Sequence, residues 1–469
     1  MQARWSELVR GGNAGPTAVV AGGMILHALN TFIVATILPS VVRDIGGLRW
    51  FAWSTVLYVV ASLLGGAFCA RVLHRLGARG AFRLALAGFA AGSAVCALAP
   101  AMPVLLAGRL LQGLGAGTLS ALSFTMVRTL FPSRLWPRAL SVVSMSWGVA
   151  TLLGPAVGGV FAQFGIWRGA FWTVGAAAPL LLVAVELSLP RGGVRPSRPA
   201  GALPAGNLLL LTGSVLAVSV GSMSQQPLGN AAGLAAALAG LGLFAWREAA
   251  GGPRLFPVGA THPGSPLAAT YAAMILLLVG TTPEIFVPYF LQTLHGLIPL
   301  HAGYVSALMA IGWTLGSVFS SGAAAGRARG ALSAGPAVLA AGLAGLALLV
   351  PPPGPPGAAL AAMAVALFGI GAGIGMTWPH LGARVFGFSR EADRDVAGAS
   401  ITMVVMVGSA FGAAFGGMVT GLAGMTTPGG VPGASAAAAW LFAAFMAAPL
   451  LAALAIRRLP AQVHPVAAE

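Results

Sequence analysis

The sequence WGVATLLGPAVGG, from Trp147 to Gly159, decides how the chain is interpreted. It combines four glycines and a proline with apolar residues and lies within a long hydrophobic run. In water this segment would form a poor helix, since glycine costs about 1 kcal/mol and proline about 3 kcal/mol relative to alanine. In a membrane, small residues let two helix backbones approach closely, and neighbouring helices satisfy the backbone groups that proline frees. The stretch therefore predicts a bent membrane helix with a smooth face against a partner helix.

The composition of the whole chain fits a membrane protein. Hydrophobic residues make up 58% of the 469 residues and charged residues only 7%, whereas a soluble domain carries about 25% charged residues. The net charge of +16 comes from arginine alone, because the chain has no lysine. These arginines lie in short connections between apolar runs, so they predict orientation in a membrane rather than nucleic-acid binding. We therefore expect a multi-spanning protein whose partner is the lipid bilayer and not a nucleic acid.

Fourteen apolar runs are long enough to cross a bilayer, for which a helix needs about 20 residues. They occupy residues 17–40, 51–73, 81–100, 104–128, 139–163, 169–189, 205–223, 229–246, 265–291, 302–325, 331–350, 357–383, 395–423 and 435–456. Of the 25 arginines, 21 fall on one side of these runs, Arg43, Arg49 and Arg168 fall on the other, and Arg109 lies within a run. The positive-inside rule then predicts that both termini are cytoplasmic and that the protein spans the cytoplasmic (inner) membrane. A total of 12 spans stays open, because removing the pair at 205–246 leaves both termini on the same side.

A weak internal repeat divides the chain into two blocks. The tetrapeptide Ala-Arg-Gly-Ala occurs at 78–81 and again at 328–331, and the pattern Gly-x-x-x-Gly-Gly occurs at 154–159 and again at 412–417. The matches keep the same order at offsets of 250 and 258 residues, as in parallel repeats of six helices related by an axis along the membrane normal. The predicted organisation is a cytoplasmic N-terminus at 1–16, a six-helix bundle at 17–190, a cytoplasmic linker at 191–204, an extra helix pair with its loop at 205–264, a second six-helix bundle at 265–456 and a cytoplasmic C-terminus at 457–469.

Four stretches resemble motifs of the major facilitator superfamily, and specifically of its 14-span drug:proton antiporters. ARVLHRLGARG at 70–80 resembles the family's G-x-L-x-D-R-x-G-R-R loop, and RLLQGLGAG at 109–117 resembles its R-x-x-Q-G-x-G-A motif. Residues 148–159 resemble the antiporter motif of the fifth span, and LNTFIVATILP at 29–39 resembles the first-span motif L-D-x-T-I-V-N-V-A-L-P. The resemblance implies an all-α membrane fold of two six-helix bundles with pseudo-two-fold symmetry and an extra central helix pair. It also implies a monomer that exports small apolar or cationic organic compounds in exchange for protons, by alternating access.

The resemblance and the repeat together assign residues to conformational gating or close packing. These residues are Arg75, Gly77, Arg79, Gly148, Gly154, Pro155, Gly158, Gly159, Gly412 and Gly416. Two departures from the family pattern matter: Asn30 stands where the first-span motif has aspartate, and His74 stands where the loop has aspartate. Asn30 cannot titrate, so a proton carrier must lie elsewhere. The loop lacks the acid by which the family is expected to latch its inner gate.

One acid lies inside a predicted span. Glu284 falls between Pro283 and Pro288 in the sequence TTPEIFVPYF, and an ionisable residue within a span is a functional hypothesis by default because it is costly there. Desolvation favours the neutral form of a carboxyl group, as a proton carrier requires. Glu284 follows Asn30 by 254 positions, close to the repeat offsets, so it occupies about the place in the second bundle that the missing aspartate would take in the first. We predict that Glu284 carries the proton; the alternative is a carboxylate that extends to the outer headgroups.

Several other side chains are candidates for the transport path. His27, Asn30 and Val34 share one helical face, and a histidine can titrate near physiological pH, although a hydrogen-bonded structural role is an equal alternative for His27. Arg109 shares a face with Gln112, and a buried arginine needs an acceptor, which is Asn30, a backbone carbonyl or the substrate. The predicted substrate cavity comprises Asn30, Arg109, Gln112, Trp313, Trp378, His380, Met403 and Met406. The aromatic and methionine side chains face lipid or neighbouring helices in the alternative reading.

Other energy sources and chemistries have no motif in the sequence. There is no G-x-x-x-x-G-K-[ST] loop for ATP, no H-E-x-x-H or clustered Cys/His pattern for a metal, and no G-x-S-x-G elbow. We therefore expect no cofactor and a proton gradient as the energy source. The alternatives are an uncoupled facilitator or a product-specific exporter of a lipid, antibiotic or metabolite, which the lost first-span acid favours. An intramembrane enzyme and a non-transporting scaffold or receptor are more remote alternatives.

Overall fold

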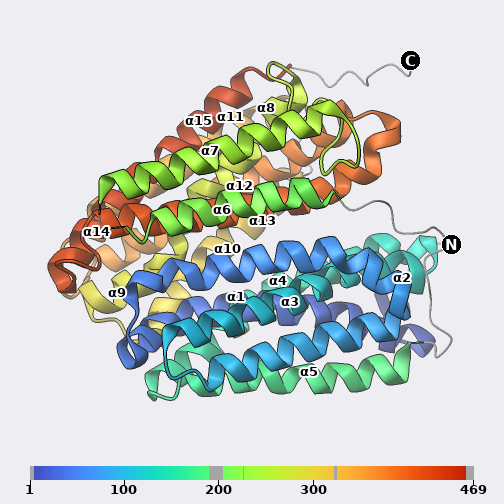
Figure 1. The fold of residues 1–469 in the computed structure, drawn as a ribbon, viewed down its shortest axis with the longest axis horizontal. Helices are drawn as coiled ribbons and strands as arrows, with labels where there is room; N and C mark the ends of the chain where they lie inside the picture. Colours follow the sequence, from blue (N-terminus) through green and yellow to red (C-terminus); the bar gives the residue numbers. More distant parts are fainter. Residues whose placement is uncertain (1–4, 190–203, 225, 322–324, 461–469) are drawn as a thin grey trace. The chain divides into compact units, whose positions relative to one another are not determined.

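The protein is helical almost throughout in a computed structural model that describes residues 5–189, 204–224, 226–321 and 325–460. Within these residues, 12 helical segments are long and apolar enough to cross a membrane. The predicted linker at 191–204 lies outside the described residues except for its last position. The α-helices are α1 (Ala14–Ile45), α2 (Phe51–Ala97), α3 (Met102–Leu130), α4 (Trp136–Gln163), α5 (Arg168–Ser188), α6 (Ala205–Gly221), α7 (Pro227–Ala250), α8 (Pro266–Thr281), α9 (Val287–His295), α10 (Pro299–Ser321), α11 (Ala325–Leu349), α12 (Ala359–Phe388), α13 (Arg394–Leu422), α14 (Gly430–Phe445) and α15 (Ala447–Arg457) (Figure 1).

Two helical segments depart from the predicted pattern. The predicted connection at 74–80 is very short in the structure: α2 is helical on both sides of Gly77, which alone leaves the helical conformation with φ 69° and ψ 177°. Such a positive φ favours glycine, which has no Cβ. The run predicted as one helix at 265–291 is also interrupted: α8 and α9 are separated by the 3₁₀ helix η5 (Thr282–Phe286). Helix α6 has 17 residues and is apolar, but it is not among the 12 segments of membrane-spanning length.

The chain forms two compact units. Unit 1 contains the described residues of Met1–Gly47 and Leu57–Leu203, and unit 2 contains those of Leu48–Val56 and Pro204–Glu469. Helix α2 therefore begins in unit 2 and continues in unit 1. The helices α6 and α7 lie side by side, and α6 also contacts α13 within unit 2 (Figure 1).

In unit 1, the glycine-rich stretch of α4 packs directly against α1. A Cβ at Gly154 would overlap the Cβ of Phe32, and a Cβ at Gly158 would lie 2.9 Å from the carbonyl oxygen of Ile33. Only glycine allows the two backbones to lie this close. Gly148 differs, because a Cβ there would meet no atom within 4 Å. The smooth face thus comprises Gly154 and Gly158 and does not include Gly148.

Unit 2 repeats this packing with α13 against α8 and η5. A Cβ at Gly412 would overlap the Thr282 side chain, and a Cβ at Gly416 would lie 2.9 Å from the Phe286 ring. Phe32 and Phe286 are 254 positions apart, the same separation as Asn30 and Glu284. In each unit, a glycine-rich helix therefore packs against a phenylalanine: Phe32, two residues after Asn30, in unit 1, and Phe286, two residues after Glu284, in unit 2.

Candidate functional site

Glu284 lies at a break in the middle of a membrane-length segment. Pro283 and Pro288 have no N–H to donate, so a continuous helix would lose hydrogen bonds here. Two threonine hydroxyls take over some of the backbone carbonyls: Thr281 donates to Leu278 O and Thr282 donates to Val279 O, each at 2.7 Å. Helix breaks of this kind, at membrane depth, are typical of binding sites in membrane transporters.

The Glu284 carboxylate makes neither an ion pair nor a side-chain hydrogen bond with any described residue. The residue is half-buried, whereas its neighbours Pro283 and Phe286 are buried. It precedes the end of α9 at His295 by 11 residues, which corresponds to about 16 Å of helix and to roughly half the hydrocarbon thickness of a bilayer. Glu284 thus lies within the apolar segment Pro266–His295, away from both of its ends, and has no ion pair or side-chain hydrogen bond with a described residue.

Aromatic side chains surround the residue two positions further on. The Phe286 ring stacks on Phe51 at a centroid distance of 5.4 Å and on Phe290 at 6.3 Å. Phe51 also meets Tyr289 edge-on at 5.6 Å. All four residues belong to unit 2. The 3₁₀ turn that carries Glu284 is therefore held by an aromatic cluster and by the glycine face of α13.

The buried polar residues of unit 1 form one connected group, the unit 1 cluster, which consists of His27, Asn30, Tyr58, Arg109 and Gln112. The His27 Nδ1 atom lies 3.2 Å from the Tyr58 hydroxyl, which donates to the His27 carbonyl at 3.1 Å. The Arg109 guanidinium lies over the Tyr58 ring, with Cζ 4.1 Å from the centroid. Arg109 Nη1 donates to Gln112 Oε1 at 2.8 Å. Of the acceptors considered from the sequence for Arg109, Asn30 is not used, and the Gln112 side chain serves instead.

Asn30 has a special position in this cluster. It is fully buried and approaches the Tyr58 hydroxyl, yet neither its amide nitrogen nor its amide oxygen has a hydrogen-bond partner of normal geometry among the described residues. His27 is also buried, and its ring meets Trp147 edge-on at 5.8 Å. The cluster is therefore polar and contains one permanent positive charge, but its own residues include no carboxylate.

The candidate cavity residues of the second block lie in two places. Trp313 of α10 and Trp378 of α12 have ring centroids 5.7 Å apart, and His380 Nε2 lies 2.6 Å from Ser320 Oγ on the same pair of helices. These side chains are half-buried or buried. Met403 and Met406 are also half-buried but lie on α13. The structure brings together the α10 and α12 residues and places the methionines on a different helix.

The residues around Gly77 form a charged group at one end of unit 1. Arg79 pairs with Glu186 of α5 at 3.3 Å and also donates from Nε to the Leu189 carbonyl at 2.6 Å. Arg83 Nε lies 2.6 Å from the same carboxylate. Arg75 and His74 are exposed. Glu186 is thus the acid that pairs with the arginines following Gly77 in unit 1.

Sequence reasoning missed two residues of these networks. Tyr58 joins His27 to Arg109, and its position in an apolar run gave no signal of that role. Glu248 lies at the end of α7, where acids commonly reach the headgroups, yet it is 5% exposed. Its carboxylate accepts hydrogen bonds from Asn207 Nδ2 at 2.6 Å, Leu255 N at 2.9 Å and Phe256 N at 3.2 Å. No group of three or more His, Cys, Asp or Glu suited to a metal occurs among the residues that the structure describes.

Comparison with known sequences matches the chain to one family of membrane transporters and to related proteins. Residues 20–413 match the Major Facilitator Superfamily. A probable multidrug-efflux transporter of Mycobacterium tuberculosis is 38% identical over 453 residues, which cover 94% of this chain and 93% of that protein. Multidrug resistance protein 3 of Bacillus subtilis is 31% identical over 150 residues, which cover 32% of this chain and 29% of that protein.

Solved structures show the same fold at low sequence identity. The xylose transporter XylE of E. coli, in a partially occluded inward-open conformation, aligns with a TM-score of 0.61 and 14% identity over 94% of this chain and 97% of that chain. A bacterial homologue of the human lysosomal transporter Spinster aligns with a TM-score of 0.62 and 16% identity over 94% and 96% of the two chains. The helical fold, the match over residues 20–413 and the 38% identical relative together establish that the chain is a multi-pass membrane transporter, not an enzyme, and belongs to the Major Facilitator Superfamily.

Proposed function

We propose that the protein is a multidrug exporter that moves small apolar or cationic organic compounds out of the cell in exchange for protons. Export of drugs is supported by the 38% identical relative, which is named as a probable multidrug-efflux transporter. The observation that carries the coupling is Glu284, an acid without an ion pair among the described residues, at a helix break within the apolar segment Pro266–His295. Such an acid can change its charge while the fold around it stays intact, because no ion pair has to be broken.

The proposed cycle uses the charge of Glu284 as its switch. A proton from outside neutralises the carboxylate, which removes the cost of burying a charge and favours the return to the inward-open state. Release of the proton to the cytoplasm restores the charge when substrate binds. Asn30, the counterpart of Glu284 in the first block, stays neutral throughout, so one proton is carried by one side chain. The polar unit 1 cluster supplies fixed hydrogen-bonding groups, and no cofactor takes part.

We further propose that the chain crosses the cytoplasmic (inner) membrane 14 times as a monomer, with both termini in the cytoplasm. Helix α2 has 47 residues, which corresponds to about 70 Å, far more than the roughly 30 Å of one crossing. Dividing it at Gly77 and counting the 17-residue α6 as a span gives 14. The excess of arginines on one side of the apolar runs supports the orientation.

The second candidate is an uncoupled facilitator, or an exporter of one endogenous product, on the same fold. Asn30 favours this candidate, because the first block lacks the acid that the family motif carries. The two candidates differ in their dependence on a proton gradient and not in the substrate path.

Purified protein in proteoliposomes separates these functions, with ethidium as the probe. Proton antiport predicts that ethidium accumulates against its gradient when the lumen is acidified, and that an uncoupler stops the accumulation. A facilitator predicts exchange of ethidium between the two sides without accumulation. No movement of ethidium or of other organic cations and neutral dyes would contradict both candidates and favour a scaffold or receptor.

A further inference from the structure

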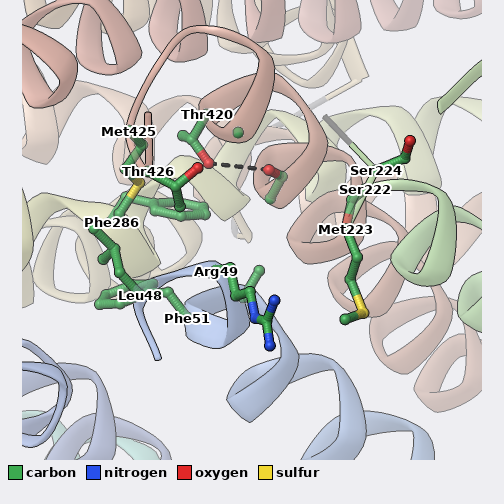
Figure 2. A pocket seen from close by; sticks show the side chains of 13 residues that line it. Leu48, Arg49, Phe51, Ser222, Met223, Ser224, Phe286, Thr420, Met425 and Thr426 are labelled. Atoms are coloured by element: carbon green, nitrogen blue, oxygen red, sulfur yellow. Dashed lines mark hydrogen bonds between the residues drawn. The ribbon is translucent and has the colours of Figure 1, made fainter. Parts of the chain in front are cut away.

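A cavity of about 240 Å³ lies in unit 2 (Figure 2). Its walls come from the η3 turn (Leu48–Trp50) and the start of α2, from the connection between α6 and α7, from Phe286 of η5, and from the end of α13 with the residues that follow it. The cavity exists because small residues line it, among them Gly421 and Ser222. Under the proposed topology it opens to the outside. We call it the Arg49 pocket.

Arg49 gives the pocket its charge. The Arg49 side chain is exposed and makes no ion pair or hydrogen bond with any described residue; its one aromatic contact is with Trp50, at 5.4 Å from Cζ to the ring centroid. No aspartate or glutamate lines the pocket. An unpaired guanidinium beside a cavity without acids selects an acidic group, because it offers several donors in a planar array to carboxylate oxygens.

Two hydroxyl groups of the pocket, those of Thr420 and Ser222, offer acceptors rather than donors. Thr420 Oγ1 donates to the Gly416 carbonyl at 2.8 Å, and Ser222 Oγ donates to the Ser219 carbonyl at 2.6 Å. Since each hydroxyl has one proton, the remaining capacity of both oxygens is to accept. Figure 2 shows the Thr420 hydroxyl on a different wall from Arg49. A ligand that fills the pocket would therefore carry an acid for Arg49 and an N–H or O–H group for these oxygens.

The rest of the lining is apolar. Phe51, Met223 and Met425 lie on the walls of the pocket (Figure 2), and methionine adapts its shape to varied ligands. Sites for drug-sized molecules measure about 300–1,000 Å³. At about 240 Å³ this pocket is smaller than those sites, so it suits a compact molecule with one ring and not a phospholipid with two acyl chains.

We propose that the Arg49 pocket is a binding site for a small amphipathic organic acid, which places its acidic group on Arg49, its N–H or O–H group on Thr420 and Ser222, and its apolar body against Met223 and Met425. Glu284 itself does not line the site, although Phe286 of the same 3₁₀ turn does, and no residue of the unit 1 cluster lines it. It also gives the connection between α6 and α7 a place in ligand binding. The inference does not depend on proton coupling or on the direction of transport.

The test uses the full chain in nanodiscs of phosphatidylcholine, with 4-aminobenzoate as the probe and isothermal titration calorimetry as the measurement. The matched probe is 4-aminobenzamide, which has the same size and ring but no charge. We expect 4-aminobenzoate to bind, and we expect the Kd of 4-aminobenzamide to be at least about tenfold higher, since hydrogen bonds to charged groups are the stronger ones. Arg49→Gln should raise the Kd for 4-aminobenzoate by about tenfold or more. Arg43→Gln removes another exposed arginine that does not line the pocket and should leave the Kd unchanged.

A second variant tests the cavity without removing the charge. A Cβ at Gly421 would have only the Ser222 carbonyl oxygen nearby, at 3.6 Å, so Gly421→Leu can be accommodated on the helix and should fill the pocket and abolish binding. Absence of 4-aminobenzoate binding, equal binding of the neutral amide, or equal losses in the Arg43 and Arg49 variants would overturn the proposal. Competition by phosphatidylglycerol added to the nanodiscs would also overturn it in favour of a lipid headgroup. Binding is measured without transport, so a failure of proton-driven export would contradict the proposed function and leave this inference standing.

Discussion

The guanidinium of Arg109 lies over the ring of Tyr58, with Cζ 4.1 Å from the ring centroid, and both side chains are buried in unit 1. A desolvated cation over an aromatic face is stabilised by the ring quadrupole, by about 2 kcal/mol when water is excluded. Gln112 completes the arrangement by accepting from Arg109 at 2.8 Å. The positive charge of Arg109, on α3, is thus stabilised within the unit 1 cluster by an aromatic ring and an amide.

A double-mutant cycle on Arg109 and Tyr58 should give a coupling free energy of about 1–2 kcal/mol. The cycle compares Arg109→Leu, Tyr58→Leu and the double variant by denaturation with SDS in mixed micelles. Tyr58→Phe is the control: it keeps the ring, so the coupling should persist, and it loses the hydroxyl contacts, among them those with His27, at a cost of about 1 kcal/mol for each hydrogen bond. Additive single-variant effects would contradict the stacking.

The glycine face of α4 should be sensitive to one methyl group at Gly154 and insensitive at Gly148. Gly154→Ala places a Cβ onto that of Phe32, which forces α1 and α4 apart and should destabilise the protein by about 1–3 kcal/mol. Gly148→Ala meets open space and should be neutral or stabilise by up to about 1 kcal/mol through helix propensity. Thermal unfolding of the two variants in one detergent provides the comparison. Equal shifts in Tm would show that close packing is not the reason for Gly154.

The sequence pattern predicted the glycine faces but not their extent. Spacing alone puts Gly148 in the same motif as Gly154, and only the position of α1 separates the two. The prolines on either side of Glu284 indicated an unusual span, yet whether they would kink a helix or replace a turn of it depends on Thr281 and Thr282, whose hydroxyls take the carbonyls. Such local exchanges of hydrogen bonds are not encoded in hydropathy.

Long-range placement was the part that sequence could not give. Leu48–Val56 reads as the beginning of an ordinary second span, and nothing in its residues indicates that it packs in unit 2. Tyr58 and Glu248 were missed for the same reason. The partner of Tyr58, His27, lies 31 positions away in the sequence, and one partner of Glu248, Asn207, lies 41 positions away. Helix spacing predicted that Gln112, three positions after Arg109, lies beside it. Helix spacing could not predict the contact of Arg109 with Tyr58, which lies on another helix.

Glu248 should contribute to stability through the loop that follows α7. Its carboxylate accepts from Asn207 and from two backbone N–H groups, and Glu248→Gln replaces one acceptor oxygen by a donor that faces these donors. We expect destabilisation by about 2 kcal/mol. Glu391→Gln is the control, because Glu391 is an exposed acid whose ion pair with Arg394 has little net effect. SDS denaturation of both variants measures the effect. An unchanged unfolding midpoint for Glu248→Gln would contradict a stabilising role for the hydrogen bonds of Glu248.

Glu284→Gln should abolish accumulation driven by a proton gradient while leaving the substrate path open. Glutamine keeps the size and polarity of the side chain but cannot exchange a proton. In proteoliposomes with ethidium, we expect gradient-driven accumulation to fall at least tenfold and exchange of ethidium between equal concentrations to continue, a combination that general misfolding would not produce. Glu391→Gln should behave as the parent protein in both assays. Normal gradient-driven accumulation by Glu284→Gln would contradict the assignment.

If the two blocks are equivalent at Asn30 and Glu284, Asn30→Asp in the Glu284→Gln background should restore part of the accumulation, because the carboxylate then returns at the counterpart position in α1. Failure of that rescue would contradict the equivalence and leave the role of Glu284 to be decided by the single variant.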